Sequence, residues 1–156
     1  MDAFKRFLGT GFYSGLLPGM PGTWGSLAAL IFIVPIAVYG DIAGVIAFIV
    51  LASLLTIWTA STCEKEWGTD PGRMVIDEWA GQALTFIFVL PAFQSQYLWI
   101  IIVSGFVLFR IFDITKILGI HRLQAMKAGS GILADDLLAG VYAGLCLKFV
   151  TLLVIK

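Results

Sequence analysis

Long apolar segments, separated by short polar stretches, dominate the chain. No charged residue occurs between Phe7 and Gly40, between Ile42 and Cys63, or between Trp79 and Phe109. At about 1.5 Å per helical residue, Ile42–Cys63 is long enough to cross a hydrocarbon core of about 30 Å. The pattern predicts an all-α fold, a polytopic membrane helical bundle with about five transmembrane segments.

The first apolar segment is interrupted by glycine and proline throughout residues 9–26. Both residue types disfavour a straight helix, and irregular backbone at membrane depth must be satisfied by protein or water. We therefore predict a Gly/Pro-rich N-terminal loop over residues 9–26 that could re-enter the membrane. A first helix should follow from about Thr23 to Tyr39, capped by Thr23 or Ser26 and bent at Pro35.

The segment from Trp79 to Phe109 is too long for one crossing, because its 31 residues would extend about 46 Å as a helix. Pro91 and the polar residues 94–96 divide it into two parts. A third helix should therefore begin near Met74, and a fourth should run from about Tyr97 to Lys116.

The last apolar segment predicts a helix from Leu137 to Ile155, opened by Asp135 and Asp136. Residues 129–131 read Gly-Ser-Gly, which we expect to break the polar helix that precedes them. The polar residues 121–127 are predicted to form a helix at the membrane interface.

Composition agrees with a membrane location. The chain has 156 residues, of which 60% are hydrophobic and 13% are charged, outside the usual range of soluble domains. Apolar segments occupy most of the length, so residues 1–156 should form a single domain in the lipid bilayer. Ten basic residues balance ten acidic ones, which leaves no basic surface of the kind that binds nucleic acid.

The charges are distributed unevenly along the chain. With a cytoplasmic amino terminus, five crossings place eight of the ten Lys and Arg residues on the cytoplasmic side, in agreement with the positive-inside rule. The same orientation brings five carboxylates to the cytoplasmic face. These carboxylates belong to Asp77, Glu78, Asp113, Asp135 and Asp136.

A group of carboxylates at one membrane face repels itself unless a cation compensates the charge. Carboxylate oxygens are the ligands that Mg²⁺ prefers, and substrate phosphate and water commonly complete its coordination. Zinc is disfavoured, because His121 is the only histidine and Cys63 and Cys146 are not clustered. The acidic group therefore predicts a Mg²⁺ site.

Basic residues accompany one of these acids. Arg110, Asp113 and Lys116 recur every three residues, so a helix places them on one broad face. This spacing could combine a metal-binding carboxylate with two cations that bind phosphate. Glycine-rich backbone at residues 9–25 and 129–131 could offer amide groups to phosphate oxygens as well.

Each acidic group also has a purely structural interpretation. Asp135 and Asp136 could cap a helix, and Asp77 and Glu78 could be favourable acids in a first helical turn. Asp113 could belong to an ordinary interfacial ion-pair cluster. The predicted convergence of all three groups on one face favours the functional interpretation.

At these residues the sequence resembles the phosphatidylglycerophosphatase A family. The resemblance extends from residue 9 to residue 140 through several motifs in family order. The matching stretches are Gly9-Thr-Gly-Phe-Tyr-Ser-Gly15, Pro21-Gly-Thr-Trp-Gly-Ser-Leu27, Asp70-Pro-Gly-Arg-Met-Val-Ile-Asp77-Glu78-Trp-Ala-Gly81, Phe109-Arg-Ile-Phe-Asp113-Ile-Thr-Lys116 and Gly129-Ser-Gly-Ile-Leu-Ala-Asp135-Asp136-Leu-Leu-Ala-Gly140.

The resemblance implies a Mg²⁺-dependent phosphatase of the bacterial inner membrane, which converts phosphatidylglycerophosphate to phosphatidylglycerol. It implies that the five carboxylates hold the metal, and that Asp113, Arg110 and Lys116 take part in catalysis on the cytoplasmic face. Direct attack by water is favoured over a covalent intermediate, although an aspartyl-phosphate on Asp113 stays open. The alternatives are a phosphatase for another lipid phosphate, such as phosphatidate or a polyprenyl phosphate, and a non-enzymatic ion-coupled transporter or channel.

Overall fold

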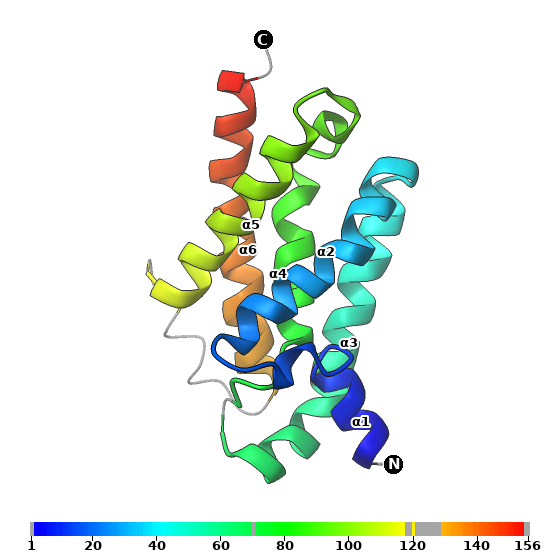
Figure 1. The fold of residues 1–156 in the computed structure, drawn as a ribbon, viewed down its shortest axis with the longest axis vertical. Helices are drawn as coiled ribbons and strands as arrows, with labels where there is room; N and C mark the ends of the chain where they lie inside the picture. The colour runs from blue at the N-terminus through cyan, green and yellow to red at the C-terminus, as the bar shows by residue number, and fades with distance from the viewer. Residues whose placement is uncertain (1, 70, 118–119, 121–128, 155–156) are drawn as a thin grey trace.

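A computed structural model describes residues 2–69, 71–117, 120 and 129–154, and in these residues it contains helices and no strand. The helices pack side by side in an elongated bundle. The amino terminus lies at the lower end and the carboxyl end of the chain at the upper end (Figure 1). The elements in chain order are α1 (Asp2–Gly9), η1 (Ser14–Leu16), α2 (Pro21–Tyr39), α3 (Ile42–Trp67), α4 (Ile76–Ile87), η2 (Leu90–Gln94), α5 (Leu98–Thr115) and α6 (Gly129–Val154).

The helical bundle confirms the predicted fold class. Within the described residues, four helices are long and apolar enough to cross a membrane, namely α2, α3, α5 and α6. The third predicted helix, expected to begin near Met74, is shorter than a transmembrane segment, because α4 has only 12 residues and is followed by the short 3₁₀ helix η2. A helix of that length extends only about 18 Å, less than a hydrocarbon core.

Helix α4 occupies the centre of the bundle, where α2, α3, α5 and α6 all pack against it (Figure 1). Its side chains are almost all buried, with Phe86 and Ala83 completely so. The outer helices turn large apolar side chains outward instead, such as Ile31, which is 71% exposed, and Phe149. The few polar side chains buried in the centre, such as Gln82 and Thr85, lie inside an apolar exterior, as expected of a bundle in lipid.

Glycines bring the centre of the bundle close together. A side chain at Gly140 of α6 would collide with the carbonyl oxygen of Gly81 in α4, and one at Gly81 would lie 2.5 Å from the carbonyl oxygen of Asp136. Small residues allow such backbone contact between membrane helices. The contact sets the second turn of α4 beside the third and fourth turns of α6.

The amino-terminal region differs from the prediction. Residues 2–9 form α1, and α2 begins at Pro21, so the loop is shorter than residues 9–26. Neither Thr23 nor Ser26 caps the helix, because the capping position is Met20 and it makes no side-chain bond. Proline is favourable in a first helical turn, and the glycines that follow serve close packing within a continuous helix. Pro35 does lie inside α2.

The start of α6 was also predicted incorrectly. The helix begins at Gly129, not at Leu137, so Asp135 and Asp136 lie inside it and cap nothing. Gly129 packs against α3, where an added side chain would lie 2.5 Å from the Cβ of Ala60. The interfacial helix expected at residues 121–127 lies outside the described residues.

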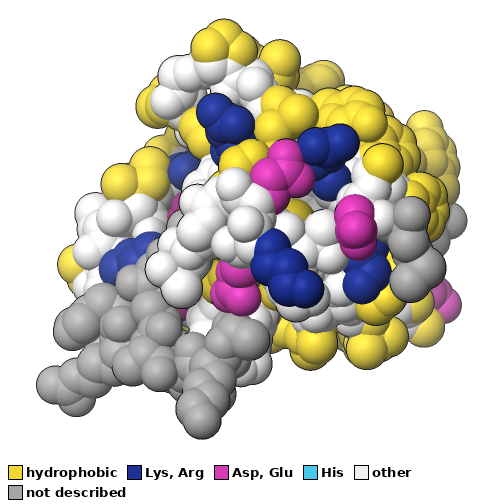
Figure 2. Space-filling model, turned by 90° about the horizontal axis from the view of Figure 1, so that it is seen from below, with side chains coloured by type: hydrophobic (Ala, Val, Ile, Leu, Met, Phe, Trp, Pro, Cys, Tyr) yellow, Lys and Arg dark blue, Asp and Glu magenta, His cyan; other side chains and the backbone are white. Residues whose placement is uncertain are grey.

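The helices alternate in direction, which defines two ends of the bundle. At the upper end, the Gln94 side chain of η2 donates a 2.6 Å hydrogen bond to the carbonyl oxygen of Val38 in α2. At the lower end, acidic and basic side chains gather on the face that Figure 2 shows from below. The described carboxylates of the predicted site belong to this lower end.

Candidate active site

A cavity of ≈ 180 Å³ opens at the lower end, between α4, α5, α6 and the loop before α4. All five predicted carboxylates and Lys116 line it. The lining residues are Pro71, Gly72, Met74, Asp77, Glu78, Asp113, Lys116, Ile132, Asp135 and Asp136.

Helix α4 contributes Asp77 and Glu78 from its first turn, where they are only 5% and 8% exposed. The Oδ1 atom of Asp77 is buried and has no hydrogen-bond partner among the described atoms. An unpaired carboxylate oxygen in such a position is costly, and a water molecule or a cation normally satisfies it. Asp77 therefore marks the place in the cavity where an external partner is most needed.

Helix α6 contributes Asp135 and Asp136, which the contact with Gly81 holds beside α4. Asp135 accepts a 2.6 Å hydrogen bond from the Nζ of Lys116 and a 3.1 Å bond from the backbone N–H of Asp136. Asp77 and Asp136 are near enough to interact electrostatically. The two acidic pairs thus face each other across the cavity, although they are more than fifty residues apart in the sequence.

Lys116 ends α5 in an unusual backbone conformation. Its φ of 46° is left-handed, and its N–H donates a 2.9 Å hydrogen bond to the carbonyl oxygen of Phe112. This conformation is common in a residue that terminates a helix, but a lysine gains less from it than a glycine would. The turn carries the ammonium group to Asp135 of α6.

Arg110, the other predicted cation, does not line the cavity. Its Nη1 lies 2.7 Å from the Oε2 of Glu78 and 2.6 Å from the Oδ2 of Asp113. The same Glu78 oxygen accepts a 2.6 Å hydrogen bond from the hydroxyl group of Ser26. Arg110 therefore lies behind the two carboxylates, on the side away from the cavity.

Ser26 and its neighbour Gly22 were not predicted as site residues. Ser26 is completely buried, and a side chain at Gly22 would collide with the Oε1 of Glu78. The sequence shows both residues only as small members of an apolar segment, which gives no sign of a polar partner. Their motif contributed to the family resemblance, but the resemblance alone assigned them no role.

Five carboxylates against the two cations Arg110 and Lys116 leave an excess of negative charge in a largely buried site. The donor set suits a hard cation such as Mg²⁺, and the unpaired Asp77 oxygen fits the same interpretation. Among the residues that the structure describes, however, no three His, Cys, Asp or Glu side chains converge into a preformed metal-binding group. The carboxylates thus fit the ion in chemistry, without a preformed coordination geometry.

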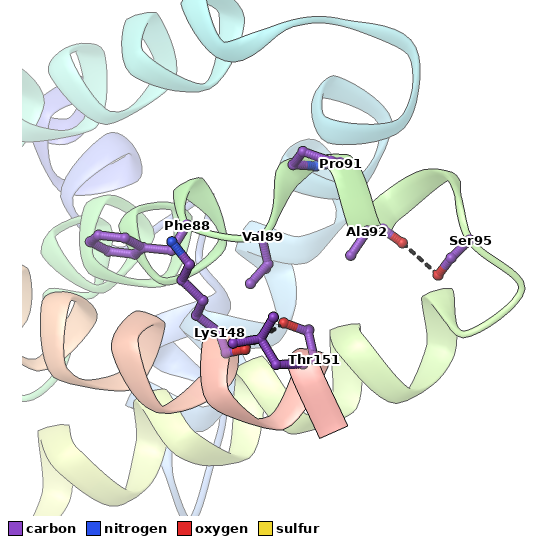
Figure 3. A pocket seen from close by; sticks show the side chains of 8 residues that line it. Phe88, Val89, Pro91, Ala92, Ser95, Lys148 and Thr151 are labelled. Atoms are coloured by element: carbon purple, nitrogen blue, oxygen red, sulfur yellow. Dashed lines mark hydrogen bonds between the residues drawn. The ribbon is translucent and has the colours of Figure 1, made fainter. Parts of the chain in front are cut away.

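A second hollow, of ≈ 330 Å³, lies at the upper end between the end of α4, η2 and α6 (Figure 3). It is mainly apolar, and the Lys148 side chain points along it toward Phe88. Its two hydroxyl groups are already committed, since Ser95 donates to the carbonyl oxygen of Ala92 and Thr151 to that of Lys148. None of the described residues that line this hollow carries a carboxylate, so it does not compete as the active site.

Comparison with known proteins agrees with the geometry. A sequence model of the phosphatidylglycerophosphatase A family matches residues 7–151, which include every residue of the acidic cavity. The chain belongs to this family. No solved structure gives a significant match.

Three relatives align with most of the chain. A phosphatidylglycerophosphatase A of Haemophilus influenzae is 36% identical over 88% of this chain and 83% of its own length. The phosphatidylglycerophosphatase A of Escherichia coli is 33% identical over 93% of this chain and 82% of its own length. A protein of Bacteroides thetaiotaomicron, provisionally named phosphatidylinositol-3-phosphatase, is 39% identical over 87% of this chain and 86% of its own length.

Membership of this family makes the chain a phosphatase with a lipid substrate, embedded in a membrane by its helices. The expectation of a phosphoric monoester hydrolase is therefore confirmed, and the transporter alternative is set aside. The names of the relatives agree on a phosphorylated lipid and differ in its headgroup.

Proposed function

We propose that the chain is a Mg²⁺-dependent phosphatase that hydrolyses phosphatidylglycerophosphate to phosphatidylglycerol and phosphate. The observation that carries the proposal is the convergence of five carboxylates and Lys116 on one cavity of ≈ 180 Å³. This combination offers negative oxygens for a divalent cation and a positive charge for the phosphate that the cation would share.

The metal would be held by Asp77, Glu78, Asp113, Asp135 and Asp136, which supply oxygen donors from three helices. Bound Mg²⁺ would supply charge neutralisation for the phosphate and an activated water molecule. Asp77 has the clearest part in this arrangement, because its unpaired Oδ1 is available to a cation or to a water molecule.

Lys116 would stabilise the phosphoryl oxygens as negative charge develops on them. Its ammonium group reaches the cavity while Asp135 holds it, so little reorientation is required when the substrate binds. No Cys, Ser or His is among the described residues that line the cavity. Direct attack by water is therefore the favoured route, and a phosphorylated Asp113 is the alternative.

The position of the cavity suits a lipid headgroup. It opens at the charged end of the bundle, where the apolar helices meet polar surroundings (Figure 2). A phospholipid could present its phosphate there while its acyl chains stay in the bilayer. The positive-inside rule supports the cytoplasmic face of a bacterial inner membrane as the side on which the cavity opens.

A second candidate substrate is a phosphoinositide. It is favoured by the provisional name of the Bacteroides relative, which shares 39% of aligned residues with this chain. The acidic cavity would serve either lipid, since both offer a terminal phosphate monoester. The headgroup therefore has to be decided by experiment.

Purified protein in lipid nanodiscs should be assayed against phosphatidylglycerophosphate, phosphatidylinositol 3-phosphate, phosphatidate and a polyprenyl phosphate, with Mg²⁺ and with EDTA. We expect the greatest phosphate release from phosphatidylglycerophosphate and loss of release in EDTA. Faster turnover of the phosphoinositide would replace the proposed substrate by the second candidate. Full activity in EDTA would contradict the Mg²⁺ requirement.

A further inference from the structure

Three polar side chains from three helices meet directly behind the acidic cavity. Ser26 of α2 donates a 2.6 Å hydrogen bond to the Oε2 of Glu78 in α4. Arg110 of α5 donates to the same oxygen at 2.7 Å and lies 3.4 Å from the Ser26 hydroxyl group. Arg110 also reaches Asp113, one helical turn further along α5.

We propose that Ser26 and Arg110 are positioning residues, which together fix the carboxylates of Glu78 and Asp113 toward the cavity. This inference rests on the proposed Mg²⁺-dependent function, and it reassigns Arg110. The sequence led us to expect that Arg110 contacts the phosphate. Its place in the structure favours an indirect role instead.

The first argument concerns access. Arg110 is absent from the lining of the cavity, whereas Glu78, Asp113 and Lys116 line it. The Arg110 side chain is only 14% exposed, and its Nη1 already has two carboxylate partners. A phosphate in the cavity would therefore meet Glu78, Asp113 and Lys116 before it met Arg110.

The second argument concerns charge. Glu78 and Asp113 repel each other when both are ionised, and a buried guanidinium between them offsets that repulsion. Arginine suits this role better than lysine, because its guanidinium group is more weakly hydrated than an ammonium group and stays charged when it is buried. Arg110 thus allows two negative groups to remain next to each other in a site with little solvent.

The third argument concerns fit. The first turns of α2 come so close to Glu78 that only glycine is accommodated at position 22, where a Cβ would also lie 2.9 Å from the Arg110 nitrogens. Ser26 lies one turn further along the same face and is completely buried. The close approach of α2 therefore delivers a hydroxyl group to Glu78 from a helix that contributes nothing to the cavity lining.

A positioning role predicts weaker metal binding rather than weaker phosphate binding. Ser26→Ala and Arg110→Lys should each weaken Mn²⁺ binding, measured by electron paramagnetic resonance without substrate, by about 10- to 100-fold, as for other residues that orient metal ligands. The concentration of Mg²⁺ that gives half-maximal turnover should rise by a similar factor. The KM for the lipid at saturating Mg²⁺ should stay near that of the wild type.

Thr56→Val is the matched control, because Thr56 is also completely buried but donates only to the carbonyl oxygen of Ala52 in its own helix. It should leave Mn²⁺ binding unchanged. Unchanged Mn²⁺ binding with a raised lipid KM in Arg110→Lys would overturn the positioning role and restore Arg110 as a phosphate ligand. Absence of Mn²⁺ binding in the wild-type protein would instead overturn the proposed metal site itself, and the positioning role with it. If Ser26→Ala fails to fold, Arg110→Lys decides the question alone.

Discussion

Asp113 lies in the last turn of α5, where the helix dipole disfavours a negative charge. Its carboxylate is held by Arg110 and faces the cavity. The positive charge of Arg110 compensates the unfavourable interaction between the Asp113 carboxylate and the helix dipole. The proposed metal ion would add a second positive charge. Its charge, more than its size, should therefore matter for turnover.

Asp113→Asn keeps the size of the side chain and removes the charge, so it should abolish Mg²⁺-dependent turnover while the protein still folds and inserts. Release of phosphate from the lipid substrate measures the first effect, and thermal unfolding in detergent measures the second. Glu66→Gln is the control, because Glu66 is exposed and pairs only with the exposed Arg6. Near-normal turnover of Asp113→Asn together with loss in Glu66→Gln would move the metal site to the end of α3.

At the scale of single residues, the sequence predicted the charged residues that line the cavity, but it did not predict the small residues behind them. Asp77, Glu78, Asp113, Asp135, Asp136 and Lys116 were identified because ionised groups next to apolar segments need an explanation. Ser26 and Gly22 gave no such signal, since a serine and a glycine in an apolar helix are ordinary. Their importance depends on the helix that packs against them, and a local sequence pattern does not reveal that neighbour.

The contact between α4 and α6 determines whether the two acidic pairs meet. It depends on Gly81 and Gly140, whose missing side chains let the two backbones touch. Each glycine would be unfavourable in a helix considered alone. In the bundle, both glycines allow the close helix crossing that brings the two acidic pairs together.

Gly140→Ala should therefore separate α4 from α6 and lower the free energy of unfolding by about 1–3 kcal/mol, as overpacking does in other cores. Turnover should fall too, although Gly140 lies outside the cavity lining. Gly44→Ala is the matched control in α3, because its new methyl group would meet mainly the flexible Ile36 side chain, at 3.2 Å. Thermal unfolding and turnover of both variants check the prediction, and equal stability of the two would contradict it.

The same glycines explain where the predicted helix boundaries were wrong. Gly129 and Gly22 were interpreted as breaks, yet both lie inside the ends of long helices and pack against Ala60 and Glu78. A single sequence does not distinguish a glycine that ends a helix from a glycine that allows another helix to pack closely. The apolar segments themselves were predicted well, because their length and lack of charge follow directly from the bilayer.

The orientation of the whole molecule rests on its charge distribution. Residues 64–73 and 117–134 are predicted to face the cytoplasm, and Asp41 and residues 94–96 the opposite side. In the structure, η2 and the end of α2 share the upper end, while the acidic cavity lies at the lower end. The bundle therefore has two distinct ends, as the prediction requires.

Cysteine labelling in intact cells tests which end faces outward. In a background of Cys63→Ala and Cys146→Ala, an impermeant thiol reagent should modify Ser95→Cys directly and Thr69→Cys only after permeabilisation. Thr69 is exposed at the end of α3, so access alone would not prevent its reaction. Labelling of Thr69→Cys but not Ser95→Cys in intact cells would reverse the orientation.

The short central helix constrains how the protein can be assembled during synthesis. Helix α4 has 12 residues and carries Asp77 and Glu78, so on its own it offers the insertion machinery a poor transmembrane segment. The ribosome delivers α2 and α3 before it, and α5 and α6 after it. Retention of α4 in the bilayer therefore depends on neighbours that are already inserted or soon follow. Because α6 arrives last and brings Asp135 and Asp136, the acidic cavity forms only when biosynthesis of the bundle is nearly complete.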